Sequence, residues 1–267
     1  MESMAQLPVL MALLAGMVTW GCTSLGAAVV YMGGRSLSRR TLDVLLGFAA
    51  GVMIAASFWS LLAPALEASA HLGRLACVPV ALGFLGGAAL LRIIDWVTPH
   101  LHPTSGERDG LATPLPRSFL LVFAITLHNF PEGLAVGVGM GASQIDGSPV
   151  GLADALTLMM GIGLQNLPEG MAVSLPLLRD GYSKGKAFFI GQVSGLVEPV
   201  AAVLGAMFVS VAQPVLPSVL SFAAGAMIFV VVEEVIPESQ SSGHGDAATI
   251  GCILGFTLMM CLDTALG

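Results

Sequence analysis

Long apolar stretches separated by short polar turns dominate this chain. A helix that spans a bilayer needs about 20 consecutive, mostly apolar residues. Stretches of that length predict eight transmembrane helices, over 7–34, 41–66, 76–97, 117–141, 151–178, 186–211, 215–236 and 248–266. The first stretch is too long for a signal peptide and begins without Lys or Arg, so it is interpreted as a helix. The pattern therefore predicts an all-α integral membrane protein, folded as a single polytopic domain over residues 1–267.

Composition supports this interpretation. Of the 267 residues, 55% are hydrophobic and only 10% are charged, against about 25% charged residues in an average soluble domain. The mean hydropathy is +0.88. So little polarity cannot cover the surface of a soluble fold, which excludes a soluble enzyme, a nucleic-acid-binding domain and a disordered chain. Lipid is the expected surface partner.

The four cysteines do not form a recognisable pattern. They stand singly within apolar segments, without a CxxC pair: Cys22, Cys77, Cys252 and Cys261. We interpret them as small apolar residues rather than as a disulfide framework or a thiolate metal site.

The basic residues predict the orientation. The connections after the first, third and fifth spans, with the helix ends beside them, hold nine of the ten Lys and Arg residues. Cytoplasmic connections are the ones rich in Lys and Arg, so these three are predicted to be cytoplasmic and both termini to lie outside. The longest polar stretch, 98–116, is then a cytoplasmic loop, and it contains His100 and His102.

Two apolar segments recur in the two halves of the chain. Phe48–Ile54 matches Phe222–Ile228 at six of seven positions, and Leu82–Phe84 recurs as Leu254–Phe256. Spans 1–3 are therefore predicted to be related to spans 6–8. Because five spans separate the related segments, the two copies cross the membrane in opposite directions. Such inverted repeats are typical of secondary transporters, which bind substrate near the middle of the membrane.

A second repeat carries polar residues. His128–Val136 aligns with Gln165–Val173, with six of nine positions identical, including an Asn-x-Pro-Glu-Gly core. The two segments lie in spans four and five, which run antiparallel. The motifs are therefore predicted to meet at one depth, in a central helix pair flanked by the inverted repeat.

Three glutamates are predicted to lie about half-way along a span: Glu132, Glu169 and Glu198. A carboxylate at that depth costs several kcal/mol and is rarely kept without a partner or a function. The Lys and Arg residues lie at helix ends, so they cannot neutralise these acids by internal ion pairs. The glutamates must therefore be protonated or must bind a cation.

The neighbours of these glutamates favour a cation. His128 and Glu132 lie four residues apart, as do Gln165 and Glu169, so each pair shares a helix face. Prolines beside the three glutamates remove amide donors and are expected to free the carbonyls of Leu127, Leu164 and Gly195. The candidate ligands combine one imidazole, three carboxylates and three amides, with the thioether of Met53 as a further candidate: His128, Glu132, Glu169, Glu198, Asn129, Gln165, Asn166 and Met53. This mixed set suits Zn²⁺, Fe²⁺, Mn²⁺ or Cd²⁺ better than Ca²⁺ or Cu⁺.

Other polar residues fit a transport path. The acids placed along it are Glu67 and Asp263 at the outer entrance, and Glu233 and Glu234 towards the inner end of span seven. His100 and His102 would receive the metal on the cytoplasmic side. Asp95 is instead interpreted as the ion-pair partner of Arg92, three residues earlier.

The motifs His128-Asn129-x-Pro-Glu-Gly and Gln165-Asn166-x-Pro-Glu-Gly, followed by Glu198-Pro199, resemble the ZIP (Zrt-/Irt-like) metal transporters, in particular their GufA-type bacterial branch. The resemblance covers nearly the whole chain. It implies a homodimer in the bacterial cytoplasmic membrane that imports divalent transition metals, Zn²⁺ first, with no prosthetic group. It also implies alternating access by an elevator-like movement of spans 1, 4, 5 and 6 against the others. The ligand positions of the family correspond to the eight candidate ligands named above.

One position departs from the family. Many members carry His-Glu-x-Pro-His-Glu in span five, and close bacterial relatives carry Gln-Asp at its start, where this chain has Gln165-Asn166. An amide replaces a carboxylate there. The substitution predicts one tightly bound metal ion and a second site that is weak or empty.

Two other functions remain as alternatives. In a proton-coupled transporter of organic solutes the glutamates would carry protons, but no intramembrane Lys or Arg is predicted that could hold a carboxylate substrate. An intramembrane metalloprotease would need two histidines four residues apart with an adjacent glutamate. The segment His128–Glu132 contains only one histidine. The chain is therefore predicted not to be an enzyme.

Overall fold

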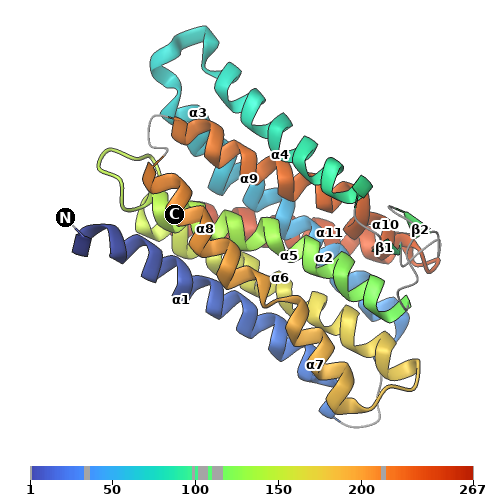
Figure 1. The fold of residues 1–267 in the computed structure, drawn as a ribbon. Coiled ribbons are helices and arrows are strands. Elements are labelled where there is room, and N and C mark those ends of the chain that lie inside the picture. Colours follow the sequence, from blue (N-terminus) through green and yellow to red (C-terminus); the bar gives the residue numbers. More distant parts are fainter. Residues whose placement is uncertain are drawn as a thin grey trace.

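The computed structural model describes residues 2–32, 37–97, 100–101, 108–109, 117–211 and 215–266. Helices make up almost all of these residues (Figure 1). The longer helices are α1 (Glu2–Ala27), α2 (Arg39–Ala56), α4 (Cys77–Val97), α5 (Arg117–Ala142), α6 (Leu152–Arg179), α8 (Val197–Val211), α9 (Leu216–Val230) and α11 (Gly245–Leu266). The shorter ones are η1 (Ala28–Tyr31), η2 (Ser57–Leu62), α3 (Ala63–Ala68), η3 (Ala70–Leu75), α7 (Lys184–Ser194), η5 (Val231–Val235) and α10 (Ile236–Gln240).

The described part of the loop predicted over 98–116 contains two short strands instead of helix. Strands β1 (His100–Leu101) and β2 (Arg108–Asp109) pair antiparallel, with His100 opposite Asp109. A two-residue strand pair adds no layer to the structure, so the chain is an essentially all-helical protein.

Six helical segments of the described chain are long and apolar enough to cross a membrane: Leu7–Tyr31, Arg39–Ala68, Cys77–Val97, Lys184–Ser210, Leu216–Gln240 and Gly245–Leu266. They make this an integral membrane protein. Helices α5 and α6 are not among the six, so the predicted total of eight spans stays a prediction. The interior of α6 carries Gln165, Asn166 and Glu169, which lower its hydropathy. These side chains are buried against other helices, so α6 does not need an apolar surface all round.

The helices form two groups by their packing. In the first bundle, α5 lies along α8, and α1 lies along both α6 and α8, with α7 beside α1 and α6. In the second bundle, α2 lies along α11 and α4 lies along α9. Figure 1 shows α4 and α9 on one side of the molecule and α1, α6 and α7 on the opposite side. The two bundles meet where α2 contacts α6 and where α5 contacts α9.

Glycines of the repeated segments bring the helices of the second bundle together. A Cβ atom at Gly51 of α2 would collide with the backbone of Cys252 in α11, and one at Gly225 of α9 would collide with the backbone of Phe84 in α4. Only glycine permits so close an approach. The two Phe-Ala-Ala-Gly segments thus occupy matching places in the α2–α11 and α4–α9 pairs.

Two helical rods contain a wider, π-helical turn. These turns are η2, between α2 and α3, and η5, between α9 and α10. Each follows its Phe-Ala-Ala-Gly segment at the same spacing. Such turns often occur at functional sites because they change which side chains face the interior. Here η2 carries Ser60, and η5 carries Glu233 and Glu234.

The span predicted over 186–211 is broken. Helix α7 ends at Ser194 and α8 begins at Val197. The carbonyl of Gly195 accepts a hydrogen bond from the amide of Glu198, at 2.9 Å. The expectation that Pro199 leaves this carbonyl free is therefore wrong, because the chain tightens into a turn at the break.

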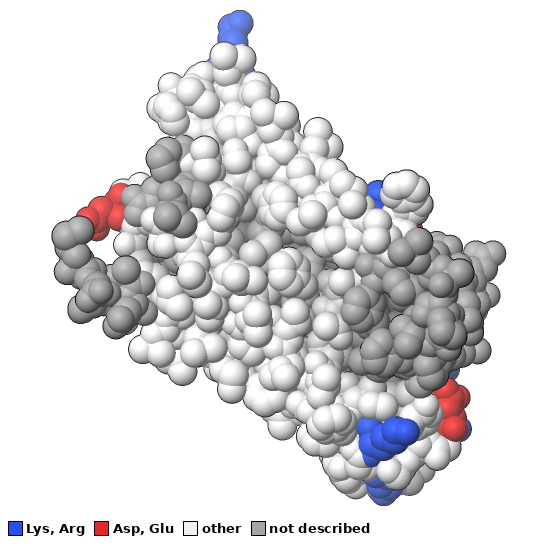
Figure 2. Space-filling view, viewed as in Figure 1, with Lys and Arg blue, Asp and Glu red and all other residues white. Residues whose placement is uncertain are grey.

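The surface matches a lipid environment. Figure 2 shows uncharged atoms over the middle of the visible face, with the charged side chains towards its ends. Large apolar side chains are exposed along the outer helices, for example Leu82 and Leu85 on α4 and Ile253 on α11. In water these would be unfavourable, whereas lipid covers them without loss.

Candidate metal centre

A group of polar side chains is buried in the first bundle. Helix α5 contributes Asn129 and Glu132, α6 contributes Gln165, Asn166 and Glu169, and α8 contributes Glu198. All are fully buried except Glu169, which is 7% exposed. Glu132 interacts with Gln165, Glu169 and Glu198. The fold therefore brings together residues that the sequence places on three separate spans.

The glycine of each Asn-x-Pro-Glu-Gly motif explains how these helices come so close. A Cβ atom at Gly133 would collide with the backbone of Glu198, and one at Gly170 would collide with the backbone of Thr23 in α1. Each glycine follows a buried glutamate directly. Helices α8 and α1 can therefore pack at the depth of Glu132 and Glu169.

Glu198 accepts hydrogen bonds from two neighbours and also interacts with the side chain of Thr19. Its Oε1 accepts a hydrogen bond from Thr23 Oγ1, at 2.8 Å, and its Oε2 accepts one from Asn166 Nδ2, at 2.7 Å. Asn166 Oδ1 in turn accepts a hydrogen bond from Gln165 Nε2. A continuous polar chain thus runs from α6 through Glu198 to α1.

The other polar atoms of the group lack such partners. Within the described part of the chain, both carboxyl oxygens of Glu132 and of Glu169, both polar atoms of the Asn129 side chain and Oε1 of Gln165 are buried without a hydrogen bond. Burying a polar group without a partner is costly, more so for a carboxylate. Oxygen atoms left in this way are ready to bind a cation.

His128 of α5 points towards the second bundle. Its Nε2 lies 2.7 Å from Oε1 of Glu234 in η5. His128 is also within electrostatic reach of Glu169. As they stand, no three His, Cys, Asp or Glu side chains among the described residues enclose a metal ion. The reason is visible in the contacts: His128 is engaged with Glu234, and Glu198 is engaged with Thr23 and Asn166.

The remaining predicted residues lie on other elements. Met53 is wholly buried in the apolar core on α2, a helix that contacts α6. Asp263 accepts a hydrogen bond from Ser60 Oγ, at 2.7 Å, while Glu67 is exposed near the end of α3. Glu233 is half-buried in η5.

The predictions for residues around the 98–116 loop can be checked only for Asp95. Asp95 pairs with Arg92, at 2.6 Å between Oδ2 and Nη1, as the spacing predicts. Only the backbone of His100 is described, in β1, and His102 lies outside the described residues.

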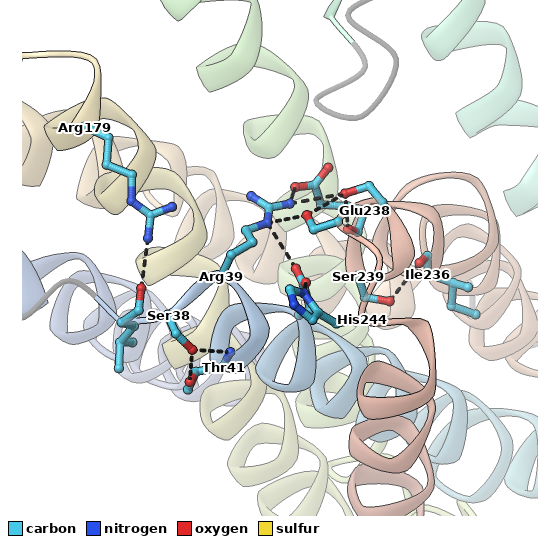
Figure 3. A network of polar contacts seen from close by, with 12 residues as sticks. Ser38, Arg39, Thr41, Arg179, Ile236, Glu238, Ser239 and His244 are labelled. Carbon is cyan, nitrogen blue, oxygen red and sulfur yellow. Dashed lines mark hydrogen bonds and ion pairs between the residues drawn. The ribbon is translucent and has the colours of Figure 1, made fainter.

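A second polar cluster, which was not predicted from the sequence, lies at the end of the molecule where α2 and α11 begin (Figure 3). Arg39 Nη2 lies 2.6 Å from Glu238 Oε1, and Arg39 Nε lies 3.1 Å from Asp43 Oδ1. His244 Nδ1 lies 2.8 Å from Asp43 Oδ2, and Ser242 Oγ accepts a hydrogen bond from Arg39 Nε. We call these five residues the Arg39 cluster. The pair Arg39–Asp43 is visible as an i,i+4 spacing, but its other partners are distant in the sequence.

The Arg39 cluster ties parts of the second bundle together. It joins the first turn of α2 to α10 and to the turn before α11. Nearby, Arg179 at the end of α6 donates a hydrogen bond to the carbonyl of Leu37, just before α2, at 2.9 Å. Figure 3 shows this contact beside the cluster. It is a polar link between the two bundles at this end.

Comparison of the chain with known proteins shows which family it belongs to. The family model described as ZIP Zinc transporter matches residues 100–263. The chain belongs to the ZIP zinc transporter family. It is 44% identical to zinc transporter ZIP11 of Bos taurus, over 97% of this chain and 98% of that protein. It is 42% identical to zinc transporter ZIPB of Bordetella bronchiseptica, over 96% and 81%, and 40% identical to zinc transporter GufA of Myxococcus xanthus, over 96% and 98%.

Membership of the ZIP family confirms the resemblance drawn from the Asn-x-Pro-Glu-Gly motifs. The family and these relatives are transporters rather than enzymes. The protease alternative is thereby excluded, as the single histidine of His128–Glu132 predicts.

Proposed function

We propose that this protein imports divalent transition-metal cations, Zn²⁺ first, through the buried group on α5, α6 and α8. The observation that carries the proposal is the set of four carboxyl oxygens on Glu132 and Glu169 that have no hydrogen-bond partner in the described part of the chain. Two carboxylates balance the charge of one divalent cation, and the cation supplies the partners that the oxygens lack. Relatives named zinc transporters, similar over nearly their whole length, support the choice of substrate.

The ligand assignment follows from the atoms that remain available. Glu132 and Glu169 provide the anionic oxygens, and Asn129 and Gln165 provide amide oxygens. His128 provides a nitrogen once it leaves Glu234, and Met53 of α2 provides a sulfur. Asn166 and Glu198 form one wall of the site. A set with one imidazole and one thioether also accepts Cd²⁺ and Fe²⁺, with Mn²⁺ less favoured.

The path and the orientation follow from the charges at the two ends. The end that carries the Arg39 cluster also carries Arg40, Arg179, Lys184 and Lys186, which supports a cytoplasmic location. Metal would then enter past Glu67 and Asp263 and leave past Glu233 and Glu234 towards His100 and His102. We further propose, from the family resemblance, a homodimer in the bacterial cytoplasmic membrane.

An elevator-like movement is supported by the way the bundles pack. Within the described residues, every helix backbone that a glycine meets at close range belongs to the same bundle, as at Gly26, Gly133 and Gly170 in the first and at Gly51 and Gly225 in the second. Between the bundles the contact is different. At Gly161 of α6 the neighbours are side-chain atoms of Met259 and Val52. Interlocked backbones move as one body, whereas side-chain contacts can be exchanged one by one.

The two halves of the second bundle support the inverted repeat. Gly51 and Gly225 hold matching positions in their helix pairs, and η2 and η5 follow at the same spacing. We infer that spans 1–3 and 6–8 are related copies in opposite orientation around the α5–α6 pair. Such a relation allows one structure to open to either side of the membrane.

Uptake into proteoliposomes tests the function. The purified protein should accumulate Zn²⁺ well above protein-free liposomes, and a panel of Zn²⁺, Cd²⁺, Fe²⁺, Mn²⁺ and Ca²⁺ should show Ca²⁺ as the poorest substrate. Uptake of no divalent cation would contradict the proposal. Proton movement without any metal would instead favour the proton-coupled solute transporter.

Orientation can be tested by cysteine labelling in sealed cells. In a variant without its four native cysteines, Ser3→Cys and Gly267→Cys should react with a membrane-impermeant maleimide, and Ser105→Cys should react only after the cells are opened. The native cysteines must be removed because Cys77 and Cys261 are exposed. Labelling of Ser105→Cys in sealed cells would reverse the proposed topology.

A further inference from the structure

Glu198 differs from the other two buried glutamates because both of its carboxyl oxygens are occupied. Thr23 Oγ1 donates to Oε1 at 2.8 Å, and Asn166 Nδ2 donates to Oε2 at 2.7 Å. Glu132 and Glu169 have no hydrogen bond to any of their four carboxyl oxygens within the described residues. Of the three buried glutamates, one is therefore held by hydrogen bonds, and the other two have carboxyl oxygens available for a cation.

The surroundings of Glu198 are shaped for this contact. A Cβ atom at Gly195 would lie 2.8 Å from Glu198 Oε1 and 2.9 Å from Thr23 Cγ2, so glycine leaves room for the threonine and the carboxyl group to meet. Thr23 is 1% exposed and Glu198 is fully buried, so water does not replace the hydroxyl. Glu198 also lies in the first turn of α8, where the helix dipole favours an acidic side chain.

The direction of the polar chain determines which atoms remain for a metal. A carboxylate only accepts hydrogen bonds, so Asn166 must present its NH₂ group to Glu198. Its oxygen then accepts from Gln165 Nε2. This chain uses the oxygen of Asn166 and both oxygens of Glu198, and it leaves Oε1 of Gln165 without a partner. Among the described members of this polar group, the oxygens without a hydrogen bond are those of Glu132, Glu169, Asn129 and Gln165.

We propose that Thr23 is a positioning residue which, together with Asn166, holds Glu198 out of the ligand shell of the transported cation. The cation is then bound between Glu132 and Glu169, and Glu198 remains beside it as an anion that does not touch it. The inference rests on the proposed function. Its consequence is kinetic: a cation held by two carboxylates rather than three leaves the site faster.

The test compares two substitutions of the same residue. Thr23→Val keeps the shape of the side chain and removes the hydroxyl, whereas Thr23→Ser keeps the donor. In Thr23→Val, Oε1 of Glu198 loses the hydrogen bond from the Thr23 hydroxyl and turns to the cation. Zn²⁺ release to a chelator, measured by stopped flow on the purified protein, should slow by about tenfold. This factor corresponds to the free energy of one charge-assisted hydrogen bond, which Glu198 exchanges for a bond to the cation. The maximal uptake rate and KM should both fall, and Thr23→Ser should behave like the unmodified protein.

Thr157→Val is the matched control. Thr157 is equally buried, on α6, and its hydroxyl has no hydrogen-bond partner among the described residues. Its removal should leave Zn²⁺ release unchanged. A purely structural effect at Thr23 would reduce the yield or thermal stability of the protein without altering the release rate of the folded fraction.

Other outcomes would overturn the inference. Unchanged release in Thr23→Val means that the hydroxyl does not control Glu198, and faster release means that Thr23 aims Glu198 at the cation as a ligand.

If Thr23→Val fails to fold, Zn²⁺ binding by Glu198→Gln tests the inference instead. It keeps an acceptor for Thr23 and should still bind one Zn²⁺, with Kd raised at most about tenfold, whereas Glu132→Gln should lose binding. Loss of the bound Zn²⁺ in Glu198→Gln contradicts the inference. If the unmodified protein takes up no divalent cation, the proposed function itself fails.

Discussion

At the scale of single residues, the neighbours of each glutamate decide what it can do. Glu132 and Glu169 lie in the middle of α5 and α6, where the backbone amides are used by the helix and, within the described residues, their carboxyl oxygens have no hydrogen-bond partner. Glu198 lies at the start of α8 and meets Thr23 and Asn166. The same side chain is thus poised for a cation in two places and already satisfied in the third.

Removal of either available carboxylate should stop transport. Glu132→Ala and Glu169→Ala each leave one carboxylate to balance a divalent cation, so Zn²⁺ uptake into proteoliposomes should fall by at least about tenfold, the effect of losing one charge-assisted ligand contact. Both variants should still reach the membrane. Asp246→Ala, which removes an exposed carboxylate at the start of α11, is the control and should transport normally. Normal uptake by both glutamate variants would mean that the buried group is not the transport site.

We expect Asn166 to control how many metal ions bind. In Asn166→Asp a carboxylate replaces the amide that donates to Glu198, at a separation of 2.7 Å. Two carboxylates so close repel each other, and a second cation between them relieves the repulsion. Equilibrium dialysis should therefore find one Zn²⁺ per chain in the unmodified protein and a value approaching two in Asn166→Asp, with transport retained. Two tightly bound ions in the unmodified protein would contradict this prediction.

At the scale of helices, breaks and close contacts place these residues. The turn between α7 and α8 puts Glu198 at a helix start, and the π-helical turn η5 directs Glu234 towards His128. Glycines at positions such as Gly133 set the spacing of neighbouring helices. A regular, unbroken helix would satisfy the backbone equally well but would present these side chains elsewhere.

The Arg39 cluster should stabilise the second bundle. Asp43 is fully buried and depends on Arg39 and His244 for partners. In Arg39→Gln the guanidinium is lost, so thermal unfolding in detergent should reveal a loss of about 1–3 kcal/mol, the range for a buried polar group left without a partner. The neighbouring Arg40 is exposed, and Arg40→Gln is the control. Equal stability of the two variants would show that the cluster contributes little.

At the scale of the whole molecule, the contacts within each bundle differ from the contacts between the two bundles. Glycine-to-backbone packing is found inside each bundle, while α6 meets α2 and α11 through side chains. The polar links between the bundles include His128–Glu234 and the hydrogen bond from Arg179 to Leu37. In the proposed site His128 is a metal ligand, so loading of the site would also release its link to Glu234.

Cross-linking tests whether the bundles must move. A Cβ atom at Gly161 of α6 would lie 3.7 Å from Val52 Cγ1 in α2, and one at Gly139 of α5 would lie 3.9 Å from Ala155 Cβ in α6. The second is a Cβ–Cβ distance and falls in the range of disulfide-bonded cysteines. The first ends at Val52 Cγ1, the place that the sulfur of a cysteine at residue 52 can take, so that sulfur would lie close to the Cβ atom at residue 161. In a variant without native cysteines, oxidation of Gly161→Cys with Val52→Cys should stop uptake, and a reductant should restore it.

The pair Gly139→Cys with Ala155→Cys lies within the first bundle and is the control. Its oxidation should leave uptake intact. Transport that continues with the bundles cross-linked would exclude a sliding movement between them.

The sequence alone determined the helical segments and the residues of the motifs. The stretch predicted over 76–97 corresponds to Cys77–Val97, and that predicted over 41–66 corresponds to Arg39–Ala68. These features are local, because a lipid environment requires each spanning segment to be apolar by itself. The paired motifs are also local, and their repetition indicated that Glu132 and Glu169 lie at one depth.

Only the tertiary structure decided which atoms meet. The hydroxyl of Thr23 reaches a glutamate 175 residues away, and Arg39 reaches Glu238 across 199 residues. A buried threonine on an apolar helix has no pattern that distinguishes it from others, since its partner belongs to another helix. The same holds for His128, whose spacing to Glu132 indicated a shared face but whose nitrogen is engaged with Glu234. Side-chain partners across helices depend on how closely the backbones pack, and that distance is set by glycines and helix breaks acting together in three dimensions.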